Sequence, residues 1–251
     1  MSPALALDLG DVLADAGLVE DATRTYSEIV EFDPASAESR RLLGDVYLRH
    51  GWYPAAYRQY KTLTDIAPSE PIGWLRLAAA AAGSGRVDEA LRIQRQVESA
   101  EGTPGPSDPR AWSRLLSAAR LARLLSDPKA PGGQAESVSR KLKELQLFAG
   151  PSAYVILTWE DYGAALSLLA FDGDKESPIG EPSEAIPAGV SSVLVPASEA
   201  SRLRWVVRFK QDPPGRKVDF LVHTVIWNGK TFEVKVKPGS LSPKDRERTV
   251  E

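Results

Sequence analysis

Small and apolar residues in the first hundred positions of the chain recur with a period of 34. Two sets of small residues stand at this spacing: Gly17, Gly51 and Gly85, and Ala22, Ala56 and Ala90. Between them, apolar residues follow one another at steps of three and four, the spacing of one helix face. A fixed period of this length is typical of a helical unit that is copied and stacked, because a single unit cannot bury its apolar face alone. The pattern predicts three repeats, over 3–36, 37–70 and 71–104.

Each repeat is predicted to be a pair of helices joined by a tight turn. In the second repeat the apolar period runs through 38–49 and resumes over 54–66. Gly51 follows the first run, where a left-handed C-cap conformation favours glycine. Pro68 ends the second run, because proline cannot continue a helix.

The helical period continues beyond the repeats. Asp108 and the proline after it form a helix-start signal, with an N-cap residue before proline at the first helical position. We expect the helix over 109–125 to cap the open end of the stack, which then spans 3–126. A linker over 127–150 contains a further amphipathic helix at 135–147.

From residue 153 the period changes from helical to two. Short runs rich in Val, Ile, Leu, Trp and Phe predict strands at 153–159, 164–171, 189–195, 203–210, 217–227 and 230–237. Asn228-Gly229, between the last two runs, is a strong hairpin signal. Short strands separated by turn residues are typical of an antiparallel β-sandwich, here over 151–238. We expect the charged tail at 239–251 to be disordered. The predicted fold class is α+β, a helical solenoid followed by an antiparallel β-sandwich.

The repeats match a known sequence signature. Seven positions of the second repeat agree with it: Leu43, Gly44, Tyr47, Gly51, Ala56, Tyr60 and Pro68. The third repeat departs from it at Gln94, where the signature has an aromatic residue. Residues 3–104 therefore resemble the tetratricopeptide repeat (TPR), a helical hairpin that stacks into solenoids and binds protein partners.

The resemblance implies that the first helix of each repeat lines a binding groove. The groove positions in this sequence are Asp11, Asp15, Arg41, Asp45, Arg49, Leu75 and Ala79. A mixed patch of acids and arginines that leads into an apolar floor suits a helix or an extended peptide with some positive charge. The alternative is that the acids and arginines form only a solvated face. The lysines and asparagines with which co-chaperone TPR domains hold a C-terminal carboxylate are missing from these positions.

Part of the strand region is similar to a second family. The segments 154–161, 203–207 and 232–236 resemble strands of the YfaP-like β domain. That domain ends many bacterial proteins built from a VIT region, a von Willebrand A domain and helical repeats. The segment 164–168 lacks the acidic motif that the family carries on its second strand. The resemblance implies that the chain is the C-terminal part of a longer protein, or a stand-alone derivative of one.

Composition narrows the classes of partner and compartment. The net charge is −3 with both signs mixed along the chain, so no segment is basic enough to follow a nucleic-acid backbone. No apolar run approaches the length of a membrane-spanning helix, so we expect no membrane insertion. There are no cysteines to form disulfides or thiolate sites. The N-terminus lacks the basic region of a signal peptide, which favours the cytoplasm if Met1 is the native start. Otherwise the compartment stays open and includes the cell envelope.

Candidates for catalysis or metal binding are few. His50 and His223 are the two histidines, and no third group completes a triad or a metal cluster with them. We therefore expect structural roles for both, and neither enzymatic activity nor a cofactor. The best metal candidate is the acidic turn with Asp172 and Asp174. Its glycine is misplaced for a calcium loop, so a solvated turn is the simpler interpretation.

These observations predict a non-catalytic scaffold that binds a protein or peptide in the groove. The β-sandwich would serve as a second recognition or anchoring module. The partner is a separate protein or peptide, or another region of a longer parent protein. The oligomeric state stays open. The alternative hypothesis is a surface protein whose β-sandwich binds carbohydrate or ions while the repeats act as a spacer.

Overall fold

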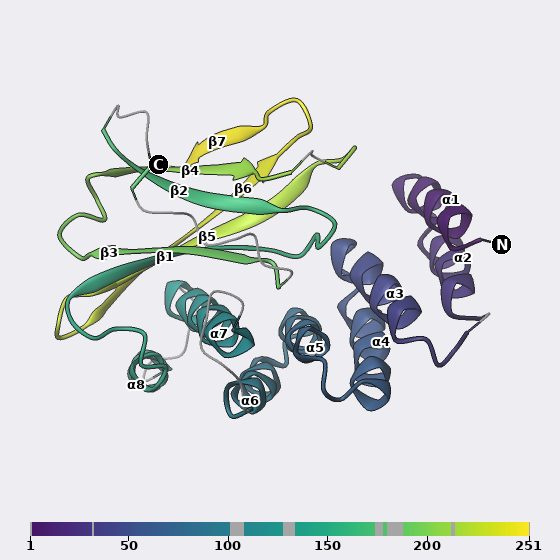
Figure 1. The fold of residues 1–251 in the computed structure, drawn as a ribbon, viewed down its shortest axis with the longest axis horizontal. Helices are drawn as coiled ribbons and strands as arrows, with labels where there is room; N and C mark the ends of the chain where they lie inside the picture. Colours follow the sequence, from purple (N-terminus) through teal and green to yellow (C-terminus); the bar gives the residue numbers. More distant parts are fainter. Residues whose placement is uncertain are drawn as a thin grey trace. The chain divides into compact units, whose positions relative to one another are not determined.

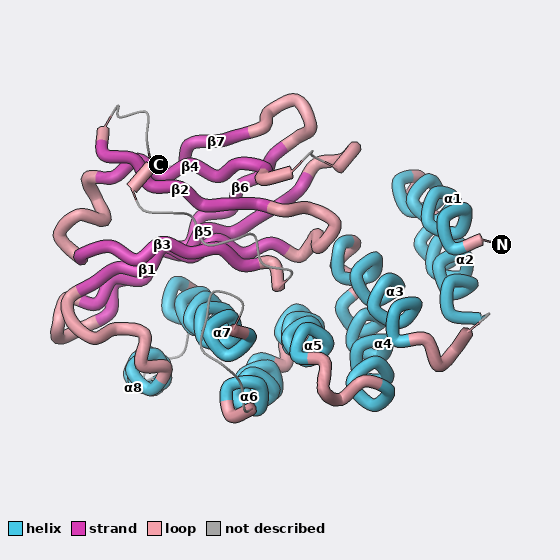
Figure 2. The backbone as a smooth tube through the Cα atoms, viewed as in Figure 1, coloured by secondary structure: helices cyan, strands magenta, loops and turns pink. Residues whose placement is uncertain are grey.

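The computed structural model describes residues 2–31, 33–100, 108–127, 134–173, 178–179, 188–211 and 214–250. In these ranges the helices are α1 (Pro3–Asp15), α2 (Val19–Glu31), α3 (Ala37–Arg49), α4 (Tyr53–Ile66), α5 (Pro71–Gly83), α6 (Val87–Glu98), α7 (Pro109–Ser126) and α8 (Gln134–Glu144). The strands are β1 (Ser152–Trp159), β2 (Leu166–Asp172), β3 (Val190–Pro196), β4 (Leu203–Phe209), β5 (Val218–Trp227), β6 (Phe232–Leu241) and β7 (Glu247–Val250). Helices precede strands throughout, which confirms the predicted α+β class (Figures 1 and 2).

The chain divides into two compact units. The first spans Met1–Ile93 and contains α1 to α5 with most of α6. The second spans Gln94–Glu251 and contains the end of α6, then α7, α8 and the strands. The helix expected to cap the solenoid, α7, therefore belongs to the unit that holds the sheets.

Each predicted turn glycine adopts the left-handed conformation. The φ angles of Gly17, Gly51 and Gly85 are +77°, +71° and +80°. In each turn the glycine N–H donates to a carbonyl three residues back at 2.9 Å, and the next N–H donates to a carbonyl five residues back at 2.8 or 2.9 Å. This pair of bonds is the Schellman motif, which satisfies the last carbonyls of a helix and reverses the chain. The 34-residue spacing of glycine therefore becomes three copies of one helix ending.

Close packing inside each hairpin explains the helical glycines. Gly44 in α3 lies under the ring of Tyr60 in α4, and a Cβ atom added to Gly44 would lie 2.7 Å from two ring atoms. Gly10 in α1 has the same relation to the ring of Tyr26 in α2. Both tyrosines are fully buried. The two helices of a pair approach this closely only because the first one carries no side chain at the contact.

The strands form a four-stranded sheet of order β3-β1-β5-β6 (sheet A) and a three-stranded sheet of order β2-β4-β7 (sheet B), with every pair antiparallel. Apolar residues of both sheets form one core, including Val155, Leu157, Leu168, Val207 and Val222. These residues alternate along their strands with residues on the opposite face, as strand geometry requires. The two sheets therefore form the predicted antiparallel sandwich.

Helix α7 covers the other face of sheet A. It contacts β1, β3, β5 and β6. Ile156 and His223 lie opposite each other in register, and each alternates with residues of the inter-sheet core. Both are buried, with exposed fractions of 0% and 2%. The helix predicted as a solenoid cap therefore contacts the end of α6 and also covers a sheet.

The tail at 239–251 differs from the disordered segment expected from sequence. Residues 239–241 continue β6, and β7 pairs with β4 so that Val250 lies opposite Trp205. Leu241 is 1% exposed and belongs to the sandwich core. Charged residues dominate the tail, but two apolar side chains and the backbone of β4 hold it in place. The helix expected at 135–147 is shorter and ends at Glu144.

Candidate binding surfaces of the repeats and the sandwich

An aspartate on α1 joins three helices at the boundary between the first two repeats. Tyr26 of α2 and Arg49 of α3 both donate hydrogen bonds to Asp11 Oδ1. The Tyr26 hydroxyl also lies 3.0 Å from His50 Nε2, just after α3. Trp52 stacks on the His50 ring with a centroid distance of 4.8 Å. This boundary therefore combines a charged link with aromatic packing.

The second repeat builds the same link one period later. Tyr60 of α4 donates to Asp45 Oδ1 at 2.5 Å, and Arg76 of α5 donates to Asp45 Oδ2 at 2.7 Å. In both links the tyrosine follows the aspartate by 15 residues. The arginine follows by 38 residues in the first link and by 31 in the second. We call each set an Asp–Tyr–Arg link, because it ties the first helix of one repeat to the first helix of the next.

The third repeat lacks this link. Ala79 stands at the aspartate position and Gln94 at the tyrosine position. Gln94 is fully buried. Its side-chain Nε2 donates a hydrogen bond to the backbone carbonyl of Ser113 in α7 at 3.4 Å, and its own backbone carbonyl accepts one from Ser113 Oγ at 2.9 Å. The departure at Gln94 thus replaces a link between repeats by a contact to α7.

Burial differs between the two links. The side chains of Asp11 and Arg49 are 39% and 17% exposed, and those of Asp45 and Arg76 are 23% and 7% exposed. Burial, together with the hydrogen bond to Asp11, raises the pKa of Tyr26 well above its ordinary value, so this hydroxyl remains a donor. Burial and the neighbouring arginine lower the pKa of His50, which favours its neutral form.

The charged residues of the predicted groove fall into three groups. Asp11, Asp45 and Arg49 belong to the links. Arg41 is 37% exposed and pairs with Glu70 at 2.6 Å. Asp15 is exposed and makes no hydrogen bond or ion pair with any other residue that the structure describes.

Leu75 and Ala79, the expected apolar floor, are 2% and 7% exposed. The structure thus pairs Asp11 with Arg49, whereas Asp15 makes no ion pair with either arginine of the prediction. Sequence reasoning missed Tyr26, Tyr60 and Arg76, although the repeated 15-residue spacing from aspartate to tyrosine was visible.

Three acids share one face of α1. Asp8, Asp11 and Asp15 are spaced by three and four residues, which places them in a row along the helix. Asp8 and Asp15 are exposed, and within the described part of the chain neither has a hydrogen-bond or ion-pair partner. The Asp–Tyr–Arg link engages Asp11 and holds α1 in place, so Asp8 and Asp15 form a negative surface on a fixed helix.

The structure describes one of the two acids of the predicted metal site. Asp172 is the last residue of β2, and Asp174 lies outside the described residues. Within the described ranges, no three His, Asp or Glu side chains are grouped so as to hold a metal ion. His223 Nε2 lies 3.0 Å from Thr158 Oγ1, a neighbour on sheet A.

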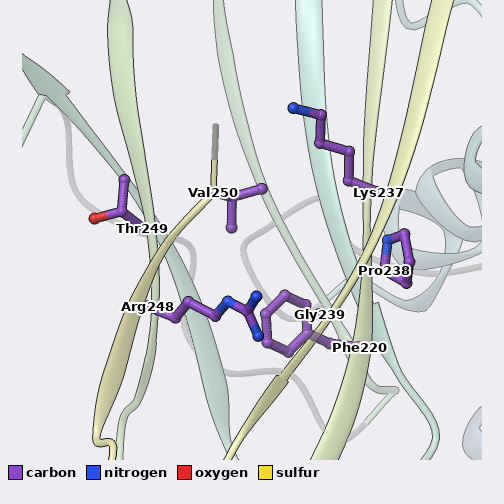
Figure 3. Close-up of a pocket in the computed structure, with 7 residues that line it drawn as sticks. All are labelled: Phe220, Lys237, Pro238, Gly239, Arg248, Thr249 and Val250. Carbon is purple, nitrogen blue, oxygen red and sulfur yellow. The ribbon is translucent and has the colours of Figure 1, made fainter.

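The sandwich contains a cavity of about 280 Å³ between two of its edge strands, β6 of sheet A and β7 of sheet B. Figure 3 shows the residues that line it: Phe220, Lys237, Pro238, Gly239, Arg248, Thr249 and Val250. The ring of Phe220 lies over Gly239, where a Cβ atom would meet it at 2.5 Å. The floor is therefore apolar, and the two charged lining residues are basic.

The stacked helical hairpins, their glycine turns and their links define the N-terminal unit as a helical repeat protein of the solenoid class. Comparison with family models is consistent and more specific: residues 7–71 and 41–109 both match the tetratricopeptide repeat model. Helices α1 to α6 thus match tetratricopeptide repeats, a module that generally mediates protein–protein interaction. The chain matches none of the curated proteins with which it was compared.

The family match covers residues 7–109, and the resemblance of the sandwich to a YfaP-like domain stays a prediction. Across the described residues, no helix has both the length and the apolar character needed to cross a membrane.

Proposed function

We propose that this chain is a non-catalytic scaffold whose TPR unit binds a protein or peptide with positive charge along α1 and α3. The observation that carries the proposal is the acidic row on α1, where Asp8 and Asp15 flank the linked Asp11. Exposed acids that face solvent attract a basic partner and speed its association. The sandwich acts as the second recognition or anchoring module.

The links between repeats support a binding role. A surface that is already fixed before binding loses little conformational entropy when a partner docks. Asp11 and Asp45 each bond a tyrosine of their own repeat and an arginine of the next, so α1, α3 and α5 are held to one another. The aspartates and arginines of the links thus hold the helices of the surface in place. Asp8, Asp15 and Arg41 supply its accessible charge.

Charge reversal tests the proposal. The full chain carrying Asp8→Lys and Asp15→Lys is immobilised beside the unchanged chain, and both are incubated with an extract of the source cells. We expect a basic partner to be retained by the unchanged chain and to be lost, by about tenfold or more, from the variant.

A matched control carries Glu31→Lys and Asp65→Lys, an equal change of charge on α2 and α4. Both sites lie near helix C-termini, where a lysine is favourable, so the control stays folded. It should retain the partner like the unchanged chain. Equal retention by all three proteins would contradict the proposal, as would loss from the control.

A further inference from the structure

The two seams of the sandwich, where an edge strand of sheet A meets one of sheet B, are built differently. At the β2–β3 seam the strands are in contact, and Leu168 N–H donates to Ser191 Oγ at 3.3 Å. At the β6–β7 seam the cavity of Figure 3 lies between the strands. Within the described residues, β6 pairs only with β5 and β7 only with β4. A side chain therefore bridges each seam, Ser191 at one and Arg248 at the other, and the β6–β7 seam also contains the cavity.

Two lysines of β6 lie on the inner face of sheet A. Lys237 is directly opposite Val222 in register, and Lys235 is opposite Thr224. Val222 belongs to the inter-sheet core, and residues directly opposite in an antiparallel pair share a face. Lys235 and Lys237 therefore stand where core residues would stand if sheet B had a further strand. Both are exposed.

A third cation comes from β7. Arg248 lies opposite Val207, a core residue of β4, so it points from sheet B toward sheet A. Figure 3 shows its side chain reaching toward Phe220, and Nη1 lies 3.5 Å from the carbonyl of Ser240. Arg248 is exposed despite its inward direction. Two basic side chains, Lys237 and Arg248, therefore line the opening, and Lys235 and Glu233 lie further along the same face of β6.

Charge along this part of the chain is opposite to that of the whole. Residues 230–250 contain six lysines and arginines against three acids, while the complete chain has a net charge of −3. These basic side chains are exposed, so their charge is available to attract an acidic partner to the seam.

The hairpin register shows which backbone groups of β6 are free. Asn228 N–H donates to the carbonyl of Thr231, which makes these two residues a hydrogen-bonded pair. Pairs alternate between bonded and non-bonded along the hairpin, so Val234 and Val236 direct their N–H and C=O groups away from β5. Pro238, which lacks an N–H, falls at another outward position and ends the row of donors.

We propose that the β6–β7 seam binds an extended acidic peptide, which adds as a strand to the free edge of β6. Its backbone pairs with Val234 and Val236. Side chains alternate in a strand, so acids two residues apart face Lys235 and Lys237, and Arg248 faces them from across the seam.

Peptide binding at the seam rests on the proposed role of the sandwich as a recognition module, and it does not depend on the α1 surface. The α1 surface uses Asp8 and Asp15, and the seam uses Lys235, Lys237 and Arg248. Charge reversal at one leaves the other unchanged, so the failure of either can be recognised separately.

The test uses the full chain and four probes. They are a fluorescent peptide of alternating threonine and glutamate, its counterpart with lysine for glutamate, a version N-methylated at alternate residues, and citrate. We expect the acidic peptide to bind at least about tenfold more tightly than the other two peptides, because charge and backbone pairing both contribute. Citrate, which carries carboxylates without a strand backbone, should not displace it at equal concentration.

Variants of the seam complete the test. Lys237→Glu with Arg248→Glu should weaken the acidic peptide by about tenfold or more. Lys230→Glu with Lys244→Glu, an equal charge change outside the lining, should leave binding nearly unchanged. All four residues are exposed, so we expect both variants to fold. Circular dichroism checks that they do. On binding, amide exchange at Val234 and Val236 should slow.

Three results would overturn the inference. If lysine and proline only protect the edge against pairing, none of the peptides binds. If citrate displaces the peptide as well as unlabelled peptide does, the seam holds small anions. If the N-methylated peptide binds equally well, strand addition is wrong.

Discussion

Replacing Asp45 by asparagine removes the charge that faces Arg76 and keeps an oxygen that accepts from Tyr60. The Arg76 side chain is only 7% exposed, so its guanidinium would remain buried without its carboxylate. Breaking a buried pair costs about 3–5 kcal/mol, and because Asp45 is 23% exposed we expect a loss of about 2–3 kcal/mol. The cost comes from the stranded charge more than from the lost attraction.

The first link is the internal control. Asp11→Asn makes the same chemical change where both partners are more exposed, at 39% and 17%. Water then solvates the remaining arginine, so the expected loss is about 1 kcal/mol. The free energy of unfolding is measured by urea titration, with helical circular dichroism as the signal.

A double variant tests the reason for the difference. Arg76→Met removes the stranded charge, so Asp45→Asn with Arg76→Met should recover about 1–2 kcal/mol relative to Asp45→Asn alone. The reasoning would be refuted by equal losses for the two asparagine variants, or by a double variant no more stable than Asp45→Asn.

Three further predictions follow from other contacts. Gly44→Ala should destabilise by about 1–3 kcal/mol in thermal unfolding, because the new Cβ would meet the Tyr60 ring at 2.7 Å; alanine in an uncrowded helix would instead stabilise. Burial and two arginines of α7 lower the pKa of His223 to about 4. The neutral form is thus favoured in the fold, and stability should be complete above pH 6.5 and fall by about 3 kcal/mol toward pH 4. Urea titrations across this range should show a flatter pH profile for His223→Gln, and an unchanged slope would contradict the assignment. Asp161, 8% exposed, accepts two hydrogen bonds of 2.7 Å from Arg216, whose side chain is 38% exposed and would be solvated after the change. Asp161→Asn should therefore cost about 1–2 kcal/mol in tryptophan-monitored unfolding of the sandwich, whereas no measurable loss would show that the pair is dispensable.

Local signals made the repeats predictable. Glycine at 17, 51 and 85 marks a backbone conformation that other residues avoid, and the structure has a positive φ at each. The change of period near residue 153 located the sandwich, because strands and helices bury different patterns of positions. The turn glycines and the change of period depend on residues that are close together in the sequence. A single sequence is therefore enough to recognise them.

Contacts between distant segments were not predictable in the same way. The arginines of the two links stand at different places in their repeats, so the 34-residue period does not reveal them. Strand β7 is charged and short, and its pairing with β4 decides its conformation. Helix α7 has an apolar face that suits a neighbouring repeat or a sheet equally well, and only tertiary packing distinguishes these outcomes.

The central claim is that the acidic face of α1 binds a protein partner, and site-specific photo-crosslinking tests it most directly. Benzoylphenylalanine is placed at Asp15, and in a second protein at Asp65 on α4, and each protein is irradiated in the source cells. The account predicts a discrete adduct with a basic protein from position 15 and none from position 65. No adduct from position 15, or the same adduct from both, would contradict it.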